Sequence, residues 1–351
     1  MCFMEWGIRK RAAFAAGALA TMLALPWGTW QSAQAQQQTY VMKISTPTIH
    51  DIPDTWANNF AAAVEKDSAG RIKTKVYPAS QLGSIPRQIE GTQFGSIQME
   101  LVPPEFMVGL DPRFQVMAAP GLVKSQAHGK RVAAEPAVQK LMLSLGADKG
   151  LHGLALFMAE PSVIISRMPL RHLADFKGKK IRIFASQFQS VAFGRLGITP
   201  VAMSLGDVLP AIQQGAIDGA STGISPIAHF HMVDAAKYVT ELDQPAIFII
   251  GEVNKKWYDS LPKDLQQILN KEAMAQSHAI NPYAVTEVKQ AEASFTSGGG
   301  QLIKLPPAEQ AEMMKTLASV GTDVSKQDPA LAAAYKIVAD AAARTRQSPT
   351  Q

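Results

Sequence analysis

The chain has 351 residues, of which 47% are hydrophobic and 18% are charged, and it contains 25 glycines and 22 prolines. This composition excludes a collagen-like or an intrinsically disordered chain, because enough apolar material is present to offset the entropy lost on folding. The formal charge of +5 would suit a nucleic-acid-binding protein and the single cysteine would suit a reactive thiol, provided that every residue belongs to the mature protein.

The first 35 residues have the architecture of a secretory signal peptide. Arg9, Lys10 and Arg11 form a basic segment, an apolar run covers residues 12–25, and residues 32–35 (SAQA) supply a cleavage pattern of small residues. The alternative is a membrane anchor, but this run has about 14 residues where a spanning helix needs about 20. We therefore expect export through the inner membrane to the periplasm, with cleavage after Ala35.

Removal of residues 1–35 changes the balance of charge and chemistry. Lys+Arg falls from 34 to 31 and Asp+Glu from 29 to 28, which leaves a formal charge of +3. Cys2 is removed as well, so a thiol nucleophile, a disulfide and a cysteine metal site are excluded. The one basic cluster is residues 177–180 (KGKK), which argues against a nucleic-acid partner. No other apolar stretch reaches about 18 residues, so we expect a protein that is not membrane-embedded.

Strands and helices alternate along the first half of the mature chain. Asp54 is the expected N-cap of the first helix, and Gly70 follows the end of that helix. The predicted strands are residues 40–45, 72–77, 96–102 and 151–158, and the predicted helices are residues 54–68, 85–94 and 127–145. This alternation favours a mainly parallel sheet covered by helices.

The second half continues the alternation and then becomes helical. The predicted strands are residues 163–166, 181–184, 199–203, 219–222, 247–253 and 301–304, and the predicted helices are residues 187–196, 207–214 and 263–295, followed by two terminal helices. A kink is expected at Pro282, and Gly298–Gly300 is expected to stop the long helix. Two α/β units with one long late helix predict two lobes around a cleft.

Signatures of catalysis are missing from the sequence. It has no nucleophile elbow, no HExxH, no phosphate-binding loop and no dinucleotide-binding glycine motif, so we expect no enzymatic activity and no cofactor. His229 and His231 lie two residues apart, on one face of an expected strand, without a third ligand nearby, so satisfied histidines are favoured over a metal site. Glu100 and Glu105 resemble an acid/base pair, but solvated or ion-paired carboxylates are favoured.

Arg182 is the most informative residue. It interrupts the apolar strand at residues 181–184 (IRIF), where alternation places it on the same side as Phe184. The planar guanidinium can hold a carboxylate with two charge-assisted hydrogen bonds. The alternative is a structural arginine, exposed or ion-paired, which the residues alone leave open.

Five segments resemble one known family in order and spacing. They are residues 76–83 (VYPASQLG), 95–99 (GSIQM), 173–182 (LADFKGKKIR), 196–203 (LGITPVAM) and 209–219 (LPAIQQGAIDG). Together with the signal peptide, they resemble the solute-binding proteins of tripartite ATP-independent periplasmic (TRAP) transporters, the C4-dicarboxylate-binding family. The resemblance covers nearly all of residues 40–320.

The resemblance implies an α/β, two-lobed periplasmic solute-binding fold, with mixed sheets flanked by helices and a long helix bridging the lobes. We expect residues 40–160 to form lobe 1, residues 161–250 to form lobe 2, and residues 251–345 to complete both. Arg182 matches the arginine of the family that pairs with the carboxylate of the ligand. The closed protein would deliver an organic acid to the TRAP membrane subunits without ATP.

The sequence departs from the family pattern at informative places. Position 98 is Gln where an acidic residue is common, and Ser162 stands where some members carry a second arginine. Residues 218–223 (DGASTG) lack the acidic residue that follows the Asp-Gly turn in many members, and in some of those it contributes to a metal site. These differences argue against a bound cation and suit a monocarboxylate held by one arginine.

Other residues of the expected cleft are assigned from their positions next to strands. Candidate ligand contacts are Arg182, Thr222, Phe184, Met158, Glu160, Thr46 and His50, while Phe157 and Phe188 suit the core better. Two alternatives to transport remain at this point. One is that the loaded protein is presented to a membrane sensor kinase, and the other is that an enzyme uses the same scaffold.

Overall fold

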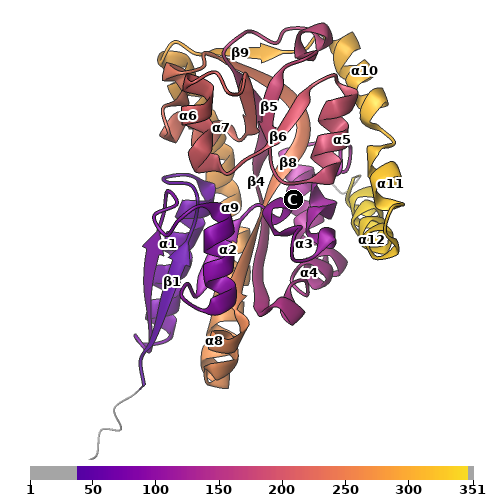
Figure 1. Ribbon diagram of the computed structural model, residues 1–351. Helices are drawn as coiled ribbons and strands as arrows, with labels where there is room; N and C mark the ends of the chain where they lie inside the picture. The colour runs from indigo at the N-terminus through magenta and orange to yellow at the C-terminus, as the bar shows by residue number, and fades with distance from the viewer. Residues whose placement is uncertain (1–37, 347–351) are drawn as a thin grey trace, which may run out of the picture. The chain divides into compact units, whose positions relative to one another are not determined.

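The computed structural model describes residues 38–346, and the side chains of residues 243–245 are not described (Figure 1). The predicted signal peptide and the cleavage site after Ala35 lie outside the described residues. None of the helices within residues 38–346 combines the length and the apolar character that crossing a membrane requires.

The described chain is a mixed α/β fold, which confirms the predicted fold class. Its strands are β1 (Tyr40–Ser45), β2 (Ile72–Tyr77), β3 (Met99–Val102), β4 (Leu151–Ser166), β5 (Lys180–Ile183), β6 (Thr199–Ala202), β7 (Gly219–Thr222), β8 (Tyr238–Asn254) and β9 (Gln301–Lys304).

Helices connect these strands and cover the sheet. The α-helices are α1 (Ile52–Asp67), α2 (Ile85–Phe94), α3 (Gln126–Ala134), α4 (Pro136–Met142), α5 (Gln187–Arg195), α6 (Val208–Gln213), α7 (Ile224–His229), α8 (Lys255–Ser260), α9 (Lys263–Ser297), α10 (Pro307–Leu317), α11 (Val320–Ser325) and α12 (Pro329–Thr345). Short 3-10 turns include η1 (Pro104–Met107), η2 (Pro112–Ala118) and η5 (Leu205–Asp207).

The strands form one mixed sheet in the order β2-β1-β3-β8-β4-β7-β5-β6, with β9 beside β8. β1 runs parallel to β2 and β3, and β5 runs parallel to β6 and β7. The pairs β3–β8, β4–β8 and β4–β7 are antiparallel. β9 runs parallel to β8. The expected parallel pairing therefore holds for most neighbouring strands, whereas the two long strands at the centre of the sheet are antiparallel to each other.

The strands β4 and β8 join two groups of strands (Figure 1). The first half of β4 pairs with the second half of β8, which also holds β3. The second half of β4 pairs with β7, and the first half of β8 pairs with β9. The register of β4 with β8 shifts between Met158 and Glu160 and again between Pro161 and Val163. These irregularities lie beside the predicted lobe boundary at residue 160, which stays a prediction.

Helix α9 is 35 residues long, continues through Pro282 and packs against α1, α7 and β4.

The sequence of helix α1 explains both where the helix begins and which face it buries. Asp51 caps it by accepting from the amide of Asp54 at 3.2 Å, so the expected cap at Asp54 is wrong by three residues. The helix then buries Trp56, Phe60 and Val64, which share one face at four-residue spacing.

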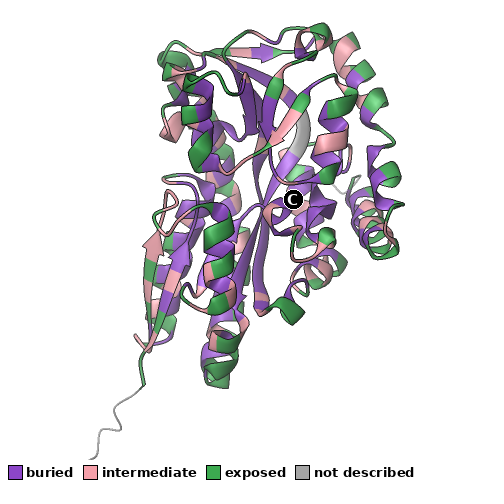
Figure 2. Cartoon of the chain, in the orientation of Figure 1, coloured by how far each residue is buried: buried purple, intermediate pink, exposed green. Residues whose placement is uncertain are grey.

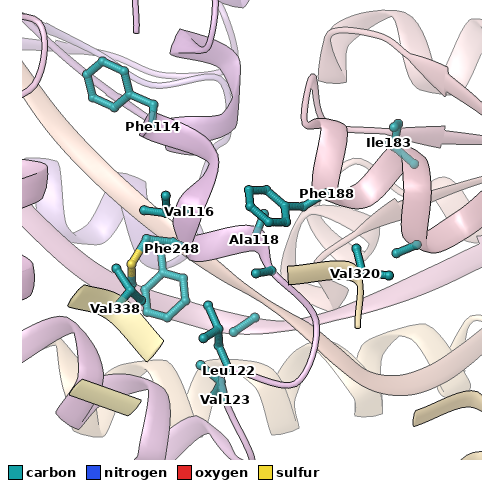
Figure 3. Packing of buried hydrophobic residues seen from close by; sticks show 14 of the residues in the cluster. Phe114, Val116, Ala118, Leu122, Val123, Ile183, Phe188, Phe248, Val320 and Val338 are labelled. Carbon is teal, nitrogen blue, oxygen red and sulfur yellow. The ribbon is translucent and has the colours of Figure 1, made fainter. Parts of the chain in front are cut away.

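Three clusters of buried apolar residues form the core. The largest takes side chains from β3, β4, β5, η2, α5 and the C-terminal helices α10 to α12. Its members include Phe114 and Val116 of η2, Phe188 of α5, Phe248 of β8 and Val338 of α12 (Figure 3). The strands are mostly buried, whereas the outer faces of the helices are exposed (Figure 2).

The predicted elements differ from the structure mainly where a proline lies within a segment. The expected helix at residues 127–145 is broken into α3 and α4, because Pro136 begins a new helix. By contrast, the expected strands at residues 151–158 and 163–166 form one strand, in which Pro161 lies at an irregularity. Strand β8 begins nine residues before the expected strand at 247–253, and three helices rather than two follow β9.

Candidate ligand-binding site

A pocket lies where the two groups of strands meet. Segments that follow the ends of β1, β3, β5 and β7 contribute to its wall, and the middle of β4 and β8 forms its floor. Ligands of α/β sheets bind at the carboxyl ends of strands, so this is the expected place for a site. The lining residues are Pro47, Thr48, Asp51, Pro53, Ile85, Leu101, Pro103, Phe106, Ala159, Glu160, Arg182, Phe184, Leu205, Thr222, Gly223, Pro226, Ile247 and Ile249.

Arg182 of β5 lines this pocket and is only 1% exposed. Its Nε donates to the carbonyl of Met203 and its Nη1 to the carbonyl of Ser221, both at 2.9 Å. The guanidinium lies over the ring of Phe184 at 4.7 Å and over that of Phe106 at 5.7 Å. Two backbone carbonyls and two aromatic rings thus fix its orientation. Within residues 38–346 no hydrogen-bond partner is found for Nη2, which leaves this donor for a ligand.

Burial also sets the charge of this end of the pocket. Loss of water lowers the pKa of Arg182 to about 9, and the charge of Glu105 raises it. The arginine therefore stays protonated near neutral pH. Burial raises the pKa of Glu105 to about 8, against the lowering effect of its own backbone and of Arg182. Glu105 is thus largely neutral at pH 7, and Arg182 is left as a cation without an ionised partner.

The loop after β1 forms another part of the wall. The hydroxyl of Thr48 donates to Asp51 Oδ1 at 2.8 Å, and the hydroxyl of Thr46 lies 3.3 Å from that of Thr48. Asp51 is 1% exposed, and its pKa is raised well above the ordinary value, chiefly by burial. Thr48 and Asp51 line the pocket, while Thr46 lies outside its lining and supports Thr48.

Glu160 belongs to the irregular middle of β4 and lines the pocket. Its Oε2 accepts from the amide of Ser225 at 3.1 Å and from its hydroxyl at 3.2 Å, so the carboxylate caps the start of α7. Burial raises the pKa of Glu160 to about 7, although the Ser225 hydrogen bonds lower it. Gly223 contacts this carboxylate so closely that a methyl group there would lie 2.1 Å from Oε1.

The structure brings four of the seven predicted contacts together. Arg182, Phe184, Glu160 and Thr222 all line the pocket. Ser162, which stands where some relatives have a second arginine, shares a 2.8 Å hydrogen bond with the hydroxyl of Ser221.

The other three predicted contacts lie elsewhere. Thr46 is one residue layer behind the wall, as described above. His50 has a left-handed backbone with φ of 58°, is exposed, and uses its amide to donate to Asp54 Oδ2 at 2.7 Å. Met158 lines a separate groove between α3, α4, β4 and α9. The register of β4 with β8 shifts between Met158 and Glu160, so the two side chains do not share a face as simple alternation would have them do.

Two aromatic residues and two histidines have the structural roles that the sequence favoured. Phe157 stacks on Trp56 at 5.6 Å, and Phe188 is fully buried in the largest cluster. His229 pairs with Glu287 at 2.8 Å. The expected strand around the histidines is wrong, because α7 ends at His229 and His231 begins a turn with φ of 50°. No group of three potential metal-ligating acids and histidines occurs in the described part of the chain.

Glu100 and Glu105 are buried, so the expectation that they are solvated or ion-paired is wrong. Glu100 of β3 lies directly opposite Glu252 of β8 in the antiparallel ladder. Both are 0% exposed, and among the described residues their carboxyl oxygens have no hydrogen-bond partner. Burial raises the pKa of both well above the ordinary value, and the charge of Glu100 raises that of Glu252 further.

Sequence reasoning missed several residues of the pocket. Thr48 and Asp51 belong to the loop that was considered, but helix capping was assigned to the wrong aspartate. Phe106 belongs to the short turn η1, and Ile247 and Ile249 belong to the part of β8 that crosses the centre of the sheet. No local pattern marks these three, because their place depends on pairing between distant strands.

A family model described as bacterial extracellular solute-binding protein, family 7 (DctP), matches residues 48–327. The chain belongs to this family, whose members bind solutes.

Individual relatives agree with this assignment. The chain is 29% identical over 315 residues to the C4-dicarboxylate-binding periplasmic protein DctP of Rhodobacter capsulatus, covering 89% of this chain and 92% of the relative. A TRAP solute-binding protein from Desulfovibrio salexigens with bound orotic acid superposes with a TM-score of 0.80 at 22% identity, covering 88% and 100%. The sugar-acid-binding protein DctPAm of Advenella mimigardefordensis, with galactonate, gives 0.83 at 20%, covering 88% and 99%. These two structures show likeness of fold.

Proposed function

We propose that this protein is the solute-binding subunit of a TRAP transporter that captures a small organic carboxylate in the pocket at Arg182. The observation that carries the proposal is the buried guanidinium, which is fixed by two carbonyls and two rings and has a free Nη2 donor toward the pocket. A desolvated arginine of this kind binds a carboxylate strongly, because its side chain is already ordered and loses little conformational entropy when the ligand binds.

Capture proceeds by closure of the two strand groups around the ligand. The pocket takes its wall from both groups, and β4 and β8 connect them through irregular pairing at Met158–Val163. Bending at a few such residues is the usual route of closure around a ligand. The closed form then delivers the acid to the membrane subunits, and the protein works in the periplasm after cleavage at Ala35.

A thermal-shift screen over mono-, di- and keto-acids tests the proposal. A micromolar ligand at millimolar concentration stabilises the folded state by about 4 kcal/mol. Arg182→Ala is expected to cost about 2–5 kcal/mol of binding free energy, because a buried clamp loses its charge and its donors. Arg167→Ala is the matched control, since Arg167 is 40% exposed and pairs with Asp218 away from the pocket.

Two results would contradict the proposal. One is a screen in which no carboxylate stabilises the wild-type protein. The other is an Arg182→Ala variant that folds and retains full stabilisation by the acid. Should that variant fail to fold, Arg182→Lys retains the cation without the planar fork and is expected to lose most of the ligand-induced shift.

A further inference from the structure

The pocket carries both signs of charge. Arg182 is the one cation among the lining residues of the described chain, and Asp51 and Glu160 are the two carboxylates. All three are at most 2% exposed. An anionic ligand alone would add a further acidic group to a desolvated space that already has two carboxyl groups, both with pKa values raised by burial, and one arginine.

The basic and the acidic side chains of the pocket come from different elements. Arg182 lies in β5 and donates to the carbonyls of Met203 and Ser221. Asp51 caps the start of α1, and Glu160 accepts from Ser225 at the start of α7. The cationic end lies beside β5, and the anionic end lies between the starts of α1 and α7.

Each end offers unused hydrogen-bonding atoms. At the cationic end Nη2 of Arg182 has no partner among the described side chains. At the anionic end Asp51 uses Oδ1 for Thr48 and for the amide of Asp54, and for Oδ2 the described residues supply no partner. Glu160 is less available, because its Oε2 holds the carboxylate at the start of α7 through Ser225. Asp51 Oδ2 is therefore the more accessible acceptor at the anionic end.

The rest of the lining is almost wholly apolar. Apart from Thr48, Thr222 and the charged residues, it consists of Gly223, Ala159 and larger apolar side chains, namely Pro47, Pro53, Ile85, Leu101, Pro103, Phe106, Phe184, Leu205, Pro226, Ile247 and Ile249. Few groups there would satisfy a polyhydroxylated ligand, so the lining suits a hydrocarbon body.

We propose that the ligand is an ω-ammonium carboxylate, which places its carboxylate on Arg182, its hydrocarbon chain along the apolar lining and its ammonium group on Asp51. Such a ligand supplies one charge of each sign, so neither of its charges is buried without an opposite partner. Burial raises the pKa of Asp51, and an ammonium group beside it would favour the ionised carboxylate. The inference rests on the proposed function, since it takes Arg182 as the carboxylate anchor.

The test uses probes that differ at one end only. Isothermal titration compares ω-amino acids of three to six carbons with the fatty acid and the dicarboxylic acid of the same carbon number. The ω-amino acid of the best-fitting length is expected to bind at least tenfold more tightly than both of its matched acids. Equal or tighter binding of a fatty acid or dicarboxylic acid would overturn the inference while leaving the proposed function intact.

A variant locates the ammonium group. Asp51→Asn keeps a good cap for α1, since asparagine caps as well as aspartate does, but it removes the charge. It is expected to weaken ω-amino acid binding at least tenfold and to bind the dicarboxylic acid no more weakly than the wild type does. Asp54→Asn is the control, because Asp54 is buried in the same turn but does not line the pocket, and it should retain the preference.

The outcomes separate the two proposals. Unchanged preference in Asp51→Asn would place the ammonium group elsewhere and overturn the inference. Absence of binding by all three kinds of probe, together with every other carboxylate of the thermal-shift screen, would overturn the proposed function itself. The wild-type titrations decide the ligand class even if the Asp51 variant does not fold.

Discussion

Arg182 and the pair formed by Glu100 and Glu252 are all buried in one sheet, but their surroundings differ. Arg182 has two carbonyl acceptors, two aromatic rings and a pocket in front of it. Glu100 and Glu252 face one another with no hydrogen-bond partner among the described residues and do not line the pocket. A buried charge with partners and access to a cavity is a candidate for binding, whereas one without either favours the neutral form.

Because of this difference, we expect removal of the charge of Arg182 to destabilise the folded protein and removal of the charge of Glu252 to stabilise it. Arg182→Met leaves the carbonyls of Met203 and Ser221 without their donors, and each buried acceptor left unsatisfied costs about 1–3 kcal/mol. We expect a loss of about 2–4 kcal/mol in the free energy of unfolding, measured by denaturant titration. Arg167→Met should change it by less than about 1 kcal/mol, because that ion pair is largely exposed. A loss no larger at Arg182 than at Arg167 would remove the distinction between the two regions.

The second variant removes the hydrogen-bond partner of Glu160, so that its carboxylate resembles those of Glu100 and Glu252. Gly223→Ala places a methyl group against the carboxylate of Glu160 and displaces it from Ser225. We expect a loss of about 1–3 kcal/mol in unfolding free energy, as overpacking in a core costs. Gly194→Ala is the control, because its site in α5 has open space and alanine favours a helix by about 0.5–1 kcal/mol. Equal stability of the two variants would show that the capping contact contributes little.

The third variant addresses the unpartnered pair. The pKa of Glu252 is raised above the ordinary 4.5 in the folded state, so the folded protein holds a proton that the unfolded chain releases. Its contribution to stability is present below about pH 4.5 and is lost as the pH rises through the raised pKa. Glu252→Gln should reduce this fall and stabilise the protein at pH 8 by about 1 kcal/mol or more, since a neutral amide avoids burying a charge.

Unfolding free energies from pH 5 to pH 9 provide the measurement for Glu252→Gln. The exposed Glu312 supplies the control, and Glu312→Gln should leave the pH profile as it is in the wild type. A Glu252→Gln variant less stable than the wild type at pH 8 would mean that the carboxylate has a partner after all.

The fold was largely predictable from the sequence, because most strands and helices carry their own periodic pattern. What the sequence did not predict depends on pairing between distant segments. Strands β4 and β8 read as separate short strands or loops, and only their mutual antiparallel pairing makes them long. Pro136 and Pro161 have the same local signal, yet one begins a new helix and the other lies within a strand.

Residues of the candidate site could be predicted where a charged side chain interrupts the apolar pattern of its strand. Arg182 in an apolar strand is such a conflict, and Phe184 follows from it by alternation. Met158 and His50 carried no comparable signal, because the local pattern does not set the direction of a side chain at a bulge or in a turn. The left-handed turn at His50 and the register shift beside Met158 place both outside the pocket.

The largest apolar cluster limits how far the two strand groups are modular. It holds Val102 and Leu156 from one group, Ile181 and Ile183 from the other, and Val338 from α12 near the end of the chain. Both strand groups therefore share this cluster with each other and with the final helix. A fragment that ends before α12 would leave apolar surface exposed on both groups at once, so the protein cannot be divided at residue 160 into two self-sufficient pieces.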